Sequence, residues 1–192
     1  MAISGRLKGY LDSLKVRYTT ATHPVVYTAQ EIAAALHVPG RQLAKNVLVK
    51  TDHGPVLAVL PAMYLIDFKK LKALLHAKTV TIGKESDIKA LFPDVEVGAM
   101  SPFGNLYQVP VVVDRTLEAQ EQITFNAGTH TQTVTMRFRD FAAAVNSKLG
   151  FFAQVTGRQK AKPAAKKKKA SKPSRAKRAT RKPARNAKTR RR

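Results

Sequence analysis

Positive charge is concentrated at the C-terminal end of this chain, and this segregation limits the part of the sequence that can fold. Residues 158–192 contain 18 of the 35 Lys and Arg residues, none of the 12 Asp and Glu residues, and no large apolar residue. Such a segment cannot bury enough apolar surface to offset the entropy that it would lose on ordering. We therefore predict a folded domain over residues 1–155 and a disordered Lys/Arg-rich tail over residues 156–192.

The composition outside the tail fits one globular domain. Before residue 158 there are 17 Lys and Arg residues against 12 Asp and Glu residues, so this part is only mildly basic. The absence of cysteine excludes disulfides, thiolate metal sites and cysteine nucleophiles, and it is typical of a reducing compartment. No apolar run approaches the roughly 18–20 residues that a membrane span needs. We expect a cytoplasmic protein with no membrane partner.

Helix and strand signals alternate irregularly along the first 155 residues. Thr28 and Glu31 have the spacing of a capping box, which predicts a helix ending at Pro39 and Gly40. The turn sequence TDHG separates the apolar runs AKNVLVK and PVLAVLP, which predicts an antiparallel hairpin. Further helices are expected near the N-terminus and in FKKLKALLHAK, SDIKALF and RDFAAAVNSKLG, and further strands in RYTTATH, TVTI, VEVGAM, YQVPVVVD, QITFNAG and HTQTVTM. This order predicts a mixed α/β (α+β) fold, a single compact domain around a mostly antiparallel or mixed sheet.

Lys45 interrupts the apolar face of the first hairpin strand. Alternation places it with Leu43, Val47 and Val49, whereas Asn46 falls on the opposite face. A lysine can reach past a strand edge with its aliphatic stem buried and its ammonium in water. A functional lysine is the other interpretation, and the strand by itself does not decide between the two.

Two glycine-containing segments also stand out. VGAMSPFGNLY contains Gly98, Ser101, Pro102 and Gly104, and TFNAGTH ends in Gly128 and His130. Glycines in such loops allow a close approach of the backbone to a ligand and leave N–H groups available as donors, although a turn without a ligand has the same appearance. No two histidines have a metal-ligand spacing with a carboxylate partner, so we predict no metal and no cofactor.

Four segments in the same order resemble the YbaK family of aminoacyl-tRNA deacylases, which is related to the editing domain inserted in bacterial prolyl-tRNA synthetases. They are YTAQEIAAALHVPGRQLAKNVLVK, GAMSPFG, PVVVD and FNAGTH, and the resemblance covers about residues 5–150. It implies a mixed α/β hydrolase that cleaves the aminoacyl ester of mischarged tRNA, acting in trans when it is a free-standing protein. An aminoacyl-tRNA synthetase is then an expected partner.

The resemblance also implies which residues form the site. Lys45 matches the strand lysine of the family and is the candidate catalytic residue. The candidate substrate-binding residues are Tyr27, Asn46, Gly98, Ser101, Pro102, Gly104, Gly128 and His130. Ala127 replaces a second glycine found in some members, which leaves alanine, cysteine, serine and threonine open as the amino acid removed. With no Ser-His-Asp or Cys-His set evident, direct attack by water is expected, with backbone N–H groups near Gly98 and Gly128 as donors.

The tail has the composition of linker-histone tails and should bind nucleic acid by neutralising phosphates. Its densest basic positions are Lys166, Lys167, Lys168, Lys169, Arg190, Arg191 and Arg192. It contains no aromatic residue for base stacking, so sequence-specific binding is not expected. The tail predicts binding of tRNA, or of other RNA or DNA. The alternative function is a non-catalytic, nucleoid-associated nucleic-acid-binding protein.

Overall fold

The structure is a computed structural model that describes residues 3–154. The helices are α1 Gly5–Ser13, α2 Ala29–Ala35, α3 Phe68–Leu75, α4 Glu85–Leu91 and α5 Phe138–Val145, with short 3-10 helices at Gly104–Tyr107 and Arg115–Ala119. The strands are β1 Tyr18–Thr22, β2 Ala44–Thr51, β3 Gly54–Pro61, β4 Leu65–Ile66, β5 Val80–Ile82, β6 Val111–Asp114, β7 Gln122–Asn126, β8 Gln132–Arg137, β9 Lys148–Gly150 and β10 Ala153–Gln154. The predicted tail, including the basic positions 166–169 and 190–192, lies outside the described residues. None of the helices within residues 3–154 is long and apolar enough to cross a membrane.

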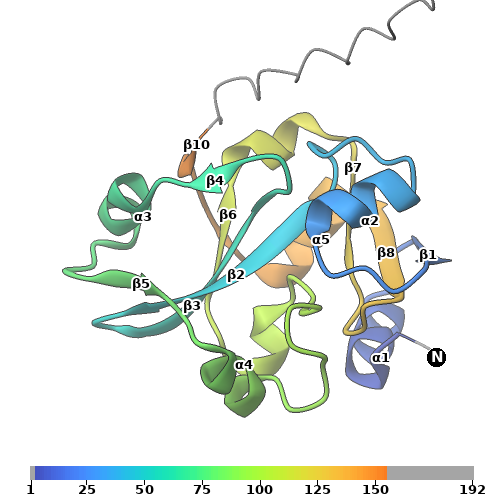
Figure 1. Ribbon diagram of the computed structural model, residues 1–192, viewed down its shortest axis with the longest axis horizontal. Coiled ribbons are helices and arrows are strands. Elements are labelled where there is room, and N and C mark those ends of the chain that lie inside the picture. Colours follow the sequence, from blue (N-terminus) through green and yellow to red (C-terminus); the bar gives the residue numbers. More distant parts are fainter. Residues whose placement is uncertain (1–2, 155–192) are drawn as a thin grey trace, which may run out of the picture. The chain divides into compact units, whose positions relative to one another are not determined.

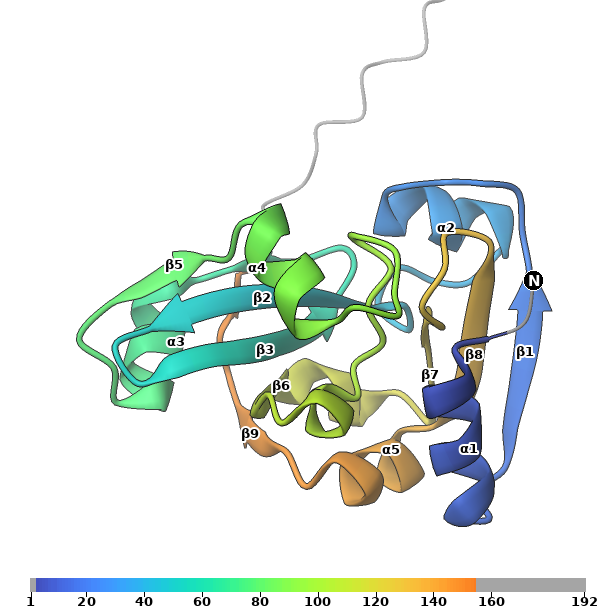
Figure 2. The same cartoon turned by 90° about the horizontal axis from the view of Figure 1, so that it is seen from below.

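The predicted fold class is confirmed, and the strands divide between three hydrogen-bonded sheets (Figures 1 and 2). The largest sheet has the order β5-β2-β3-β6-β9 and is mixed, because β2 is antiparallel to β3 and β5 whereas β6 is parallel to β3 and β9. The second sheet, β1-β8-β7, is antiparallel throughout. The third is the short antiparallel pair β10-β4. The expected hairpin is formed by β2 and β3, with Lys45 opposite Leu60.

Apolar side chains on both faces of the large sheet are buried. One face joins α1, α5 and the three-stranded sheet in the main core, where the rings of Phe103, Phe125 and Phe141 pack against one another. The other face packs against α3 through Leu71, close to Val49. Because β2 contributes residues to both cores, close packing on its two faces holds the strand, and the residues at its ends, in fixed positions.

A third and much smaller apolar cluster surrounds α2. Its buried members are Ile32, Leu43 and Ala62, and its partly buried members are Val26, Ala29, Ala33, Leu36 and Val38. We call this set the α2 cluster. It is separate from the main core, so α2 packs mainly against the start of β2 and the residue after β3.

Asp114, at the end of β6, has a completely buried carboxylate. One oxygen accepts the N–H and the hydroxyl of Thr116, and the other accepts the N–H groups of Phe152, at 2.7 Å, and Ala153, at 2.6 Å. Four donors therefore compensate the loss of water around this charge. The carboxylate fastens the segment before β10 to the end of β6.

Two expected elements are wrong. VEVGAM is a loop and not a strand, because Gly98 adopts a φ of +90° there and the segment bonds to the loop around Gly128. RDFAAAVNSKLG is not one helix, because Asn146 takes a left-handed conformation after Val145 and Lys148–Gly150 forms β9 against β6. Both departures depend on partners that are distant in the sequence.

Candidate active site

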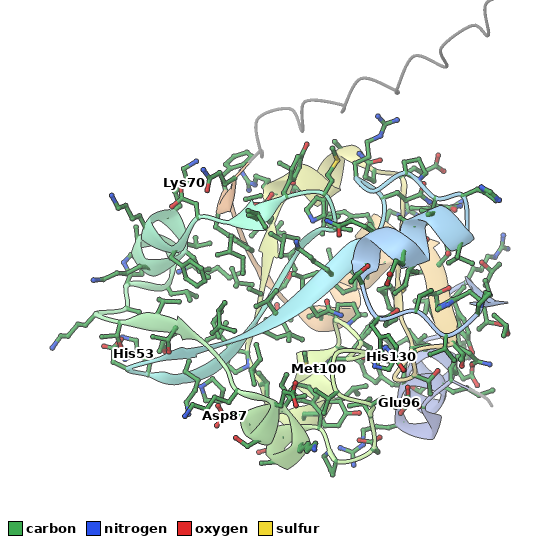
Figure 3. All side chains as sticks on the ribbon, viewed as in Figure 1. His53, Lys70, Asp87, Glu96, Met100 and His130 are labelled. Carbon is green, nitrogen blue, oxygen red and sulfur yellow. The ribbon has the colours of Figure 1, made fainter. Side chains whose placement is uncertain are left out.

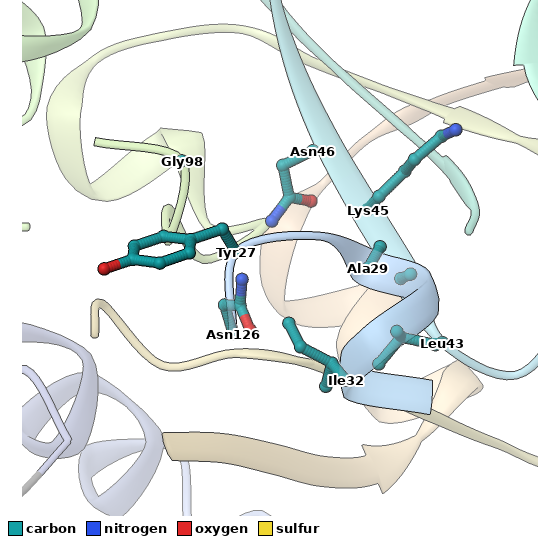
Figure 4. A pocket seen from close by; sticks show the side chains of 9 residues that line it. Tyr27, Ala29, Ile32, Leu43, Lys45, Asn46, Gly98 and Asn126 are labelled. Carbon is teal, nitrogen blue, oxygen red and sulfur yellow. The ribbon is translucent and has the colours of Figure 1, made fainter. Parts of the chain in front are cut away.

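A pocket of about 180 Å³ lies where the start of β2 meets the end of β7. The two sheets touch here through a bridge between Leu43 and Thr124, and the Thr124 N–H donates to the Gln42 carbonyl at 3.0 Å. Tyr27, Ala29, Ile32, Leu43, Ala44, Lys45, Asn46, Gly98 and Asn126 line the pocket (Figure 4). It therefore brings together residues from α2, from both sheets and from the loop that contains Gly98.

The start of α2 forms the apolar wall of the pocket. The Thr28 hydroxyl accepts the Glu31 N–H at 3.2 Å and the Glu31 carboxylate accepts the Thr28 N–H at 3.0 Å, which is the predicted capping box. These bonds hold the pKa of Glu31 below its usual range, since they favour the charged carboxylate. The cap fixes the first turn of the helix, so that Ala29 and Ile32 face the pocket.

Lys45 lies at the rim of the pocket and is half-buried. Its Nζ donates to the Ala62 carbonyl at 3.2 Å, and none of the ion pairs within residues 3–154 includes it. Burial lowers the pKa of the ammonium from its ordinary value, because no acidic side chain compensates the lost hydration. Figure 4 shows the Lys45 side chain directed away from Gly98 and Asn126.

Asn46 and Asn126 bring two side-chain amides to the pocket, one from each sheet (Figure 4). The Nδ2 of Asn46 donates to the Met100 carbonyl, which fixes the orientation of that amide. The Oδ1 atoms of both residues are buried and have no hydrogen-bond partner within the described part of the chain. Asn126 was not among the predicted site residues.

The two glycine loops are joined by a set of hydrogen bonds centred on His130. The His130 Nε2 lies 2.9 Å from the Val97 carbonyl, and the His130 N–H donates to the Glu96 carboxylate at 2.7 Å. The Glu96 N–H donates to the Gly128 carbonyl at 3.0 Å. Figure 3 shows His130 and Glu96 as neighbours. His130 thus holds the two loops together, and a Cβ on Gly98 would lie 3.4 Å from its ring.

The structure separates the predicted site residues into two groups. Tyr27, Lys45, Asn46 and Gly98 line the pocket. Ser101, Pro102, Gly104 and Gly128 do not line it, and all four are buried. His130 does not line it either and belongs to a second hollow described below.

The glycines of the second group have packing roles. A Cβ on Gly104 would approach the Val109 carbonyl to 2.7 Å, so a close approach of backbone requires glycine there. The Gly128 N–H donates to the Ala99 carbonyl at 3.0 Å, which corrects the expectation that it is a free donor. The Gly98 N–H, by contrast, has no acceptor within residues 3–154.

A second hollow of about 560 Å³ adjoins Tyr27. Its lining includes His130, Glu96 and His23. Tyr27 is 71% exposed, and its ring packs edge-on against the ring of His130, with 4.8 Å between the two ring centroids. The buried His23 has its Nδ1 2.8 Å from the Pro24 carbonyl, and its Nε2 has no partner among the described residues. Tyr27 therefore separates the small pocket from a larger and more open one. Across residues 3–154, no three His, Asp or Glu side chains are grouped so as to hold a metal ion.

Comparison with known proteins identifies the family of this domain. The family described as the aminoacyl-tRNA editing domain matches residues 23–144, which contain all the residues that line the pocket. This chain belongs to the aminoacyl-tRNA editing domain family. The predicted resemblance is therefore confirmed.

Two curated relatives match this chain over very different shares of their own length. The prolyl-tRNA editing protein ProX of Acetoanaerobium sticklandii is 26% identical over 143 residues, which cover 71% of this chain and 87% of ProX. The proline–tRNA ligase of Latilactobacillus sakei is 29% identical over 93 residues, which cover 48% of this chain and only 16% of the ligase. This editing domain therefore corresponds to a small part of the ligase and to most of ProX.

A solved structure has the same fold. It is described as a candidate trans-editing enzyme for prolyl tRNA synthetase, and it superposes with a TM-score of 0.70 at 17% identity, covering 79% of this chain and 96% of that protein. At this identity the likeness concerns the fold alone.

Proposed function

We propose that this protein is a trans-editing aminoacyl-tRNA deacylase that hydrolyses the ester of tRNA carrying a small, non-cognate amino acid. The observation that carries the proposal is the pocket of about 180 Å³ in an editing domain, which is lined by Asn46 and Gly98 and has Lys45 at its rim. ProX and the proline–tRNA ligases among its relatives make tRNA charged by prolyl-tRNA synthetase the first substrate to test.

The chemistry requires little from the protein, because an aminoacyl ester is already activated. A water oxygen forms a bond to the ester carbon, the bond to the ribose oxygen breaks, and that oxygen takes a proton to leave a free tRNA 3′ end. The free N–H of Gly98 at the pocket wall is suited to stabilise the charge that develops on the carbonyl oxygen. The pocket contributes chiefly by holding the ester in position for the water.

Lys45 is suited to bind the terminal phosphate of the tRNA and less suited to polarise the ester. Its ammonium is held at the rim by the Ala62 carbonyl and points away from Gly98 (Figure 4). A phosphate arriving there would provide the negative partner that the described residues lack. Tyr27 and the hollow beyond it then offer an exposed aromatic surface for a base of the 3′ end.

Pocket size supports selection of small acyl groups. The apolar wall of Ala29, Ile32 and Leu43 limits the side chain that can enter. Because one methylene in such a pocket changes binding by about 1–3 kcal/mol, neighbouring amino acids should be separated only modestly. Alanine, cysteine, serine and threonine are the acyl groups to compare.

The deciding experiment measures deacylation of a panel of mischarged tRNAs by the wild type, by Lys45→Ala and by Lys50→Ala. Lys50 is a matched control, because it lies on the same strand but forms an exposed ion pair with Asp87 at 3.1 Å. We expect hydrolysis by the wild type and Lys50→Ala and a large loss in Lys45→Ala. Binding of DNA or RNA without hydrolysis of any panel member would instead support the nucleic-acid-binding alternative.

The basic tail is proposed to raise the local concentration of tRNA through phosphate contacts. Replacing Lys166, Lys167, Lys168 and Lys169 with Gln should weaken tRNA binding and flatten its dependence on salt, because fewer counterions are released. Hydrolysis at saturating substrate should persist. An unchanged salt dependence would remove the tail from the proposal.

A further inference from the structure

The residues just before the basic tail are fastened to the body of the domain. Phe152 is completely buried, and the N–H groups of Phe152 and Ala153 donate to the Asp114 carboxylate. β10 then pairs with β4, so that Gln154 lies opposite Leu65. The basic tail therefore continues from a fixed point beside β4.

β4 also lies close to the pocket, through the turn that precedes it. The carbonyl of Ala62, which follows β3, accepts the hydrogen bond that holds the Lys45 Nζ at the pocket rim. Leu65 comes three residues later, a distance of at most about 11 Å along the chain. Paired residues of antiparallel strands have Cα atoms about 5 Å apart, so the Cα of Gln154 lies within about 17 Å of the Cα of Ala62. Since phosphates on one strand of a duplex rise about 3.4 Å each, this span corresponds to roughly five phosphates.

Three cations lie along this stretch of the surface. Lys45 is at the pocket rim, Lys69 is in the first turn of α3 just after β4, and Arg41 follows Gly40, whose carbonyl accepts the Met63 N–H at 3.4 Å. Arg41 and Lys69 are exposed, and none of the ion pairs within residues 3–154 includes any of the three cations. We call this surface the β4 face and define it by Arg41, Lys45, Met63, Leu65 and Lys69.

Acidic side chains favour the β4 face over the other side of the pocket as a path for phosphates. The acidic residue that follows β4, Asp67, is engaged as a helix cap, because its Oδ1 accepts two N–H groups of the first turn of α3 at 3.0 and 3.1 Å. On the other side, Glu96 lines the hollow beyond Tyr27, and the Glu31 carboxylate lies 3.3 Å from the Tyr27 nitrogen. A polyanion would therefore meet carboxylates on the Tyr27 side and cations without ionic partners on the β4 side.

We propose that the acceptor stem of the bound tRNA leaves the pocket over the β4 face. This inference rests on the proposed function and adds to it the direction in which the tRNA lies. The terminal phosphate binds Lys45, the phosphates behind it meet Arg41 and Lys69, and the stem comes to the start of the basic tail within roughly five nucleotides. The anchoring of β10 thus delivers the cations of the tail to the part of the tRNA next to the ester.

The first test uses a probe attached at one chosen position, which is possible because the chain has no cysteine. An iron chelate tethered to Leu65→Cys generates hydroxyl radicals that cut a nearby RNA or protein backbone. The ligand is proline tRNA that carries alanine through an amide bond in place of the ester. We expect cuts in the acceptor stem, strongest within about five nucleotides of the 3′ end, and none in the anticodon arm.

Leu14→Cys is the matched control for this probe. Leu14 is also an exposed leucine, but it lies at the end of α1, a helix that packs in the main core and does not adjoin β4. Its probe should leave the acceptor stem intact. Both labelled proteins should keep the wild-type kcat.

The second test removes one cation at a time. Arg41→Gln and Lys69→Gln should each weaken tRNA binding and lower the slope of log Kd against log salt by about one, the value for one lost phosphate contact. Lys89→Gln removes the same charge from α4, which packs in the main core on the other face of the large sheet from β4 (Figure 1). The slope for Lys89→Gln should equal that of the wild type, and kcat at saturating tRNA should be unchanged in all three variants.

The outcomes separate this inference from the proposed function. Deacylation by the wild type with no cuts in the acceptor stem from position 65, or salt slopes equal to that of the wild type for Arg41→Gln and Lys69→Gln, would overturn the path over the β4 face while the deacylase stands. Cuts in added prolyl-tRNA synthetase, with the tRNA spared, would assign the β4 face to a protein partner instead. Failure of the wild type on every aminoacyl-tRNA would overturn the proposed function itself.

Discussion

Buried polar groups are fully hydrogen-bonded at Asp114 but only partly hydrogen-bonded at the candidate pocket. The Asp114 carboxylate is completely buried and accepts four hydrogen bonds from its own chain. At the pocket, the acceptors of Asn46 and Asn126 have no partner in the described part of the chain, and the Lys45 ammonium has only the Ala62 carbonyl. The carboxylate of Asp114 therefore uses its hydrogen-bonding capacity to hold the structure together, whereas the polar side chains at the pocket leave part of theirs unused.

Replacing Asp114 tests the structural side of this comparison and should have the largest effect. Asp114→Ala leaves the N–H groups of Phe152 and Ala153 buried without an acceptor, at a cost of about 1–3 kcal/mol each. We expect the free energy of unfolding, measured in urea, to fall by about 3 kcal/mol or more. Asp114→Asn, which keeps one acceptor, should lose less. Unchanged stability with lost hydrolysis would place Asp114 on the functional side.

Replacing Lys45 tests the pocket side. Lys45→Ala should raise the barrier for deacylation, measured from the free enzyme and substrate, by about 2–4 kcal/mol, because the cation proposed to bind the terminal phosphate and position the ester is lost. The kcat/KM for a mischarged tRNA measures this, with Lys50→Ala as the control. Stability to urea should be nearly unchanged. Near-wild-type rates in Lys45→Ala would show that the lysine only covers the strand edge.

The helix cap of α2 has features of both regions, because its polar groups are paired with each other, as those of Asp114 are, and yet it lies next to the pocket. Thr28→Ala removes the acceptor for the Glu31 N–H and should cost about 1 kcal/mol of stability. Since α2 carries Ala29 and Ile32, selection between alanyl and larger acyl groups should weaken as well. Thermal unfolding and rates on two acyl esters measure the two effects. Stability loss with unaltered selection would confine the cap to a structural role.

The smallest expected effect is the dependence of stability on pH at Lys45. Folding lowers the pKa of Lys45, so between the folded and unfolded pKa values the unfolded state binds more protons and stability rises with pH. Lys45→Met should therefore have a slightly higher Tm than the wild type at neutral pH, and the difference should shrink as pH rises toward the ordinary lysine pKa. A difference that grows with pH would contradict a desolvated ammonium.

Much of the fold is predictable because its signals are local. The capping box at Thr28 and the TDHG turn lie within a few residues of the elements that they define, and both are confirmed. VEVGAM has the alternation of a strand, but its loop conformation depends on the distant Gly128 and His130. The pairs β9–β6 and β10–β4 have the same dependence and were not predicted.

The site is predictable only in part, for a related reason. The resemblance to a family brings Tyr27, Lys45, Asn46 and Gly98 to one place, and all four line the pocket. Sequence cannot show that an amide oxygen such as that of Asn126 is unpaired, because this depends on every neighbour in the folded state. It also cannot show that Ser101 is buried and lies outside the pocket lining.

The α2 cluster has a consequence for how such a protein can evolve. The residues that limit the acyl group, Ala29, Ile32 and Leu43, pack in a small set of apolar side chains that is distinct from the main core. A change of size at Ala29 or Ile32 can be absorbed by a few neighbours, while the strands that carry Lys45 and Asn126 remain in place. Amino acid preference can therefore diverge between lineages through few substitutions, each with little effect on the stability of the frame.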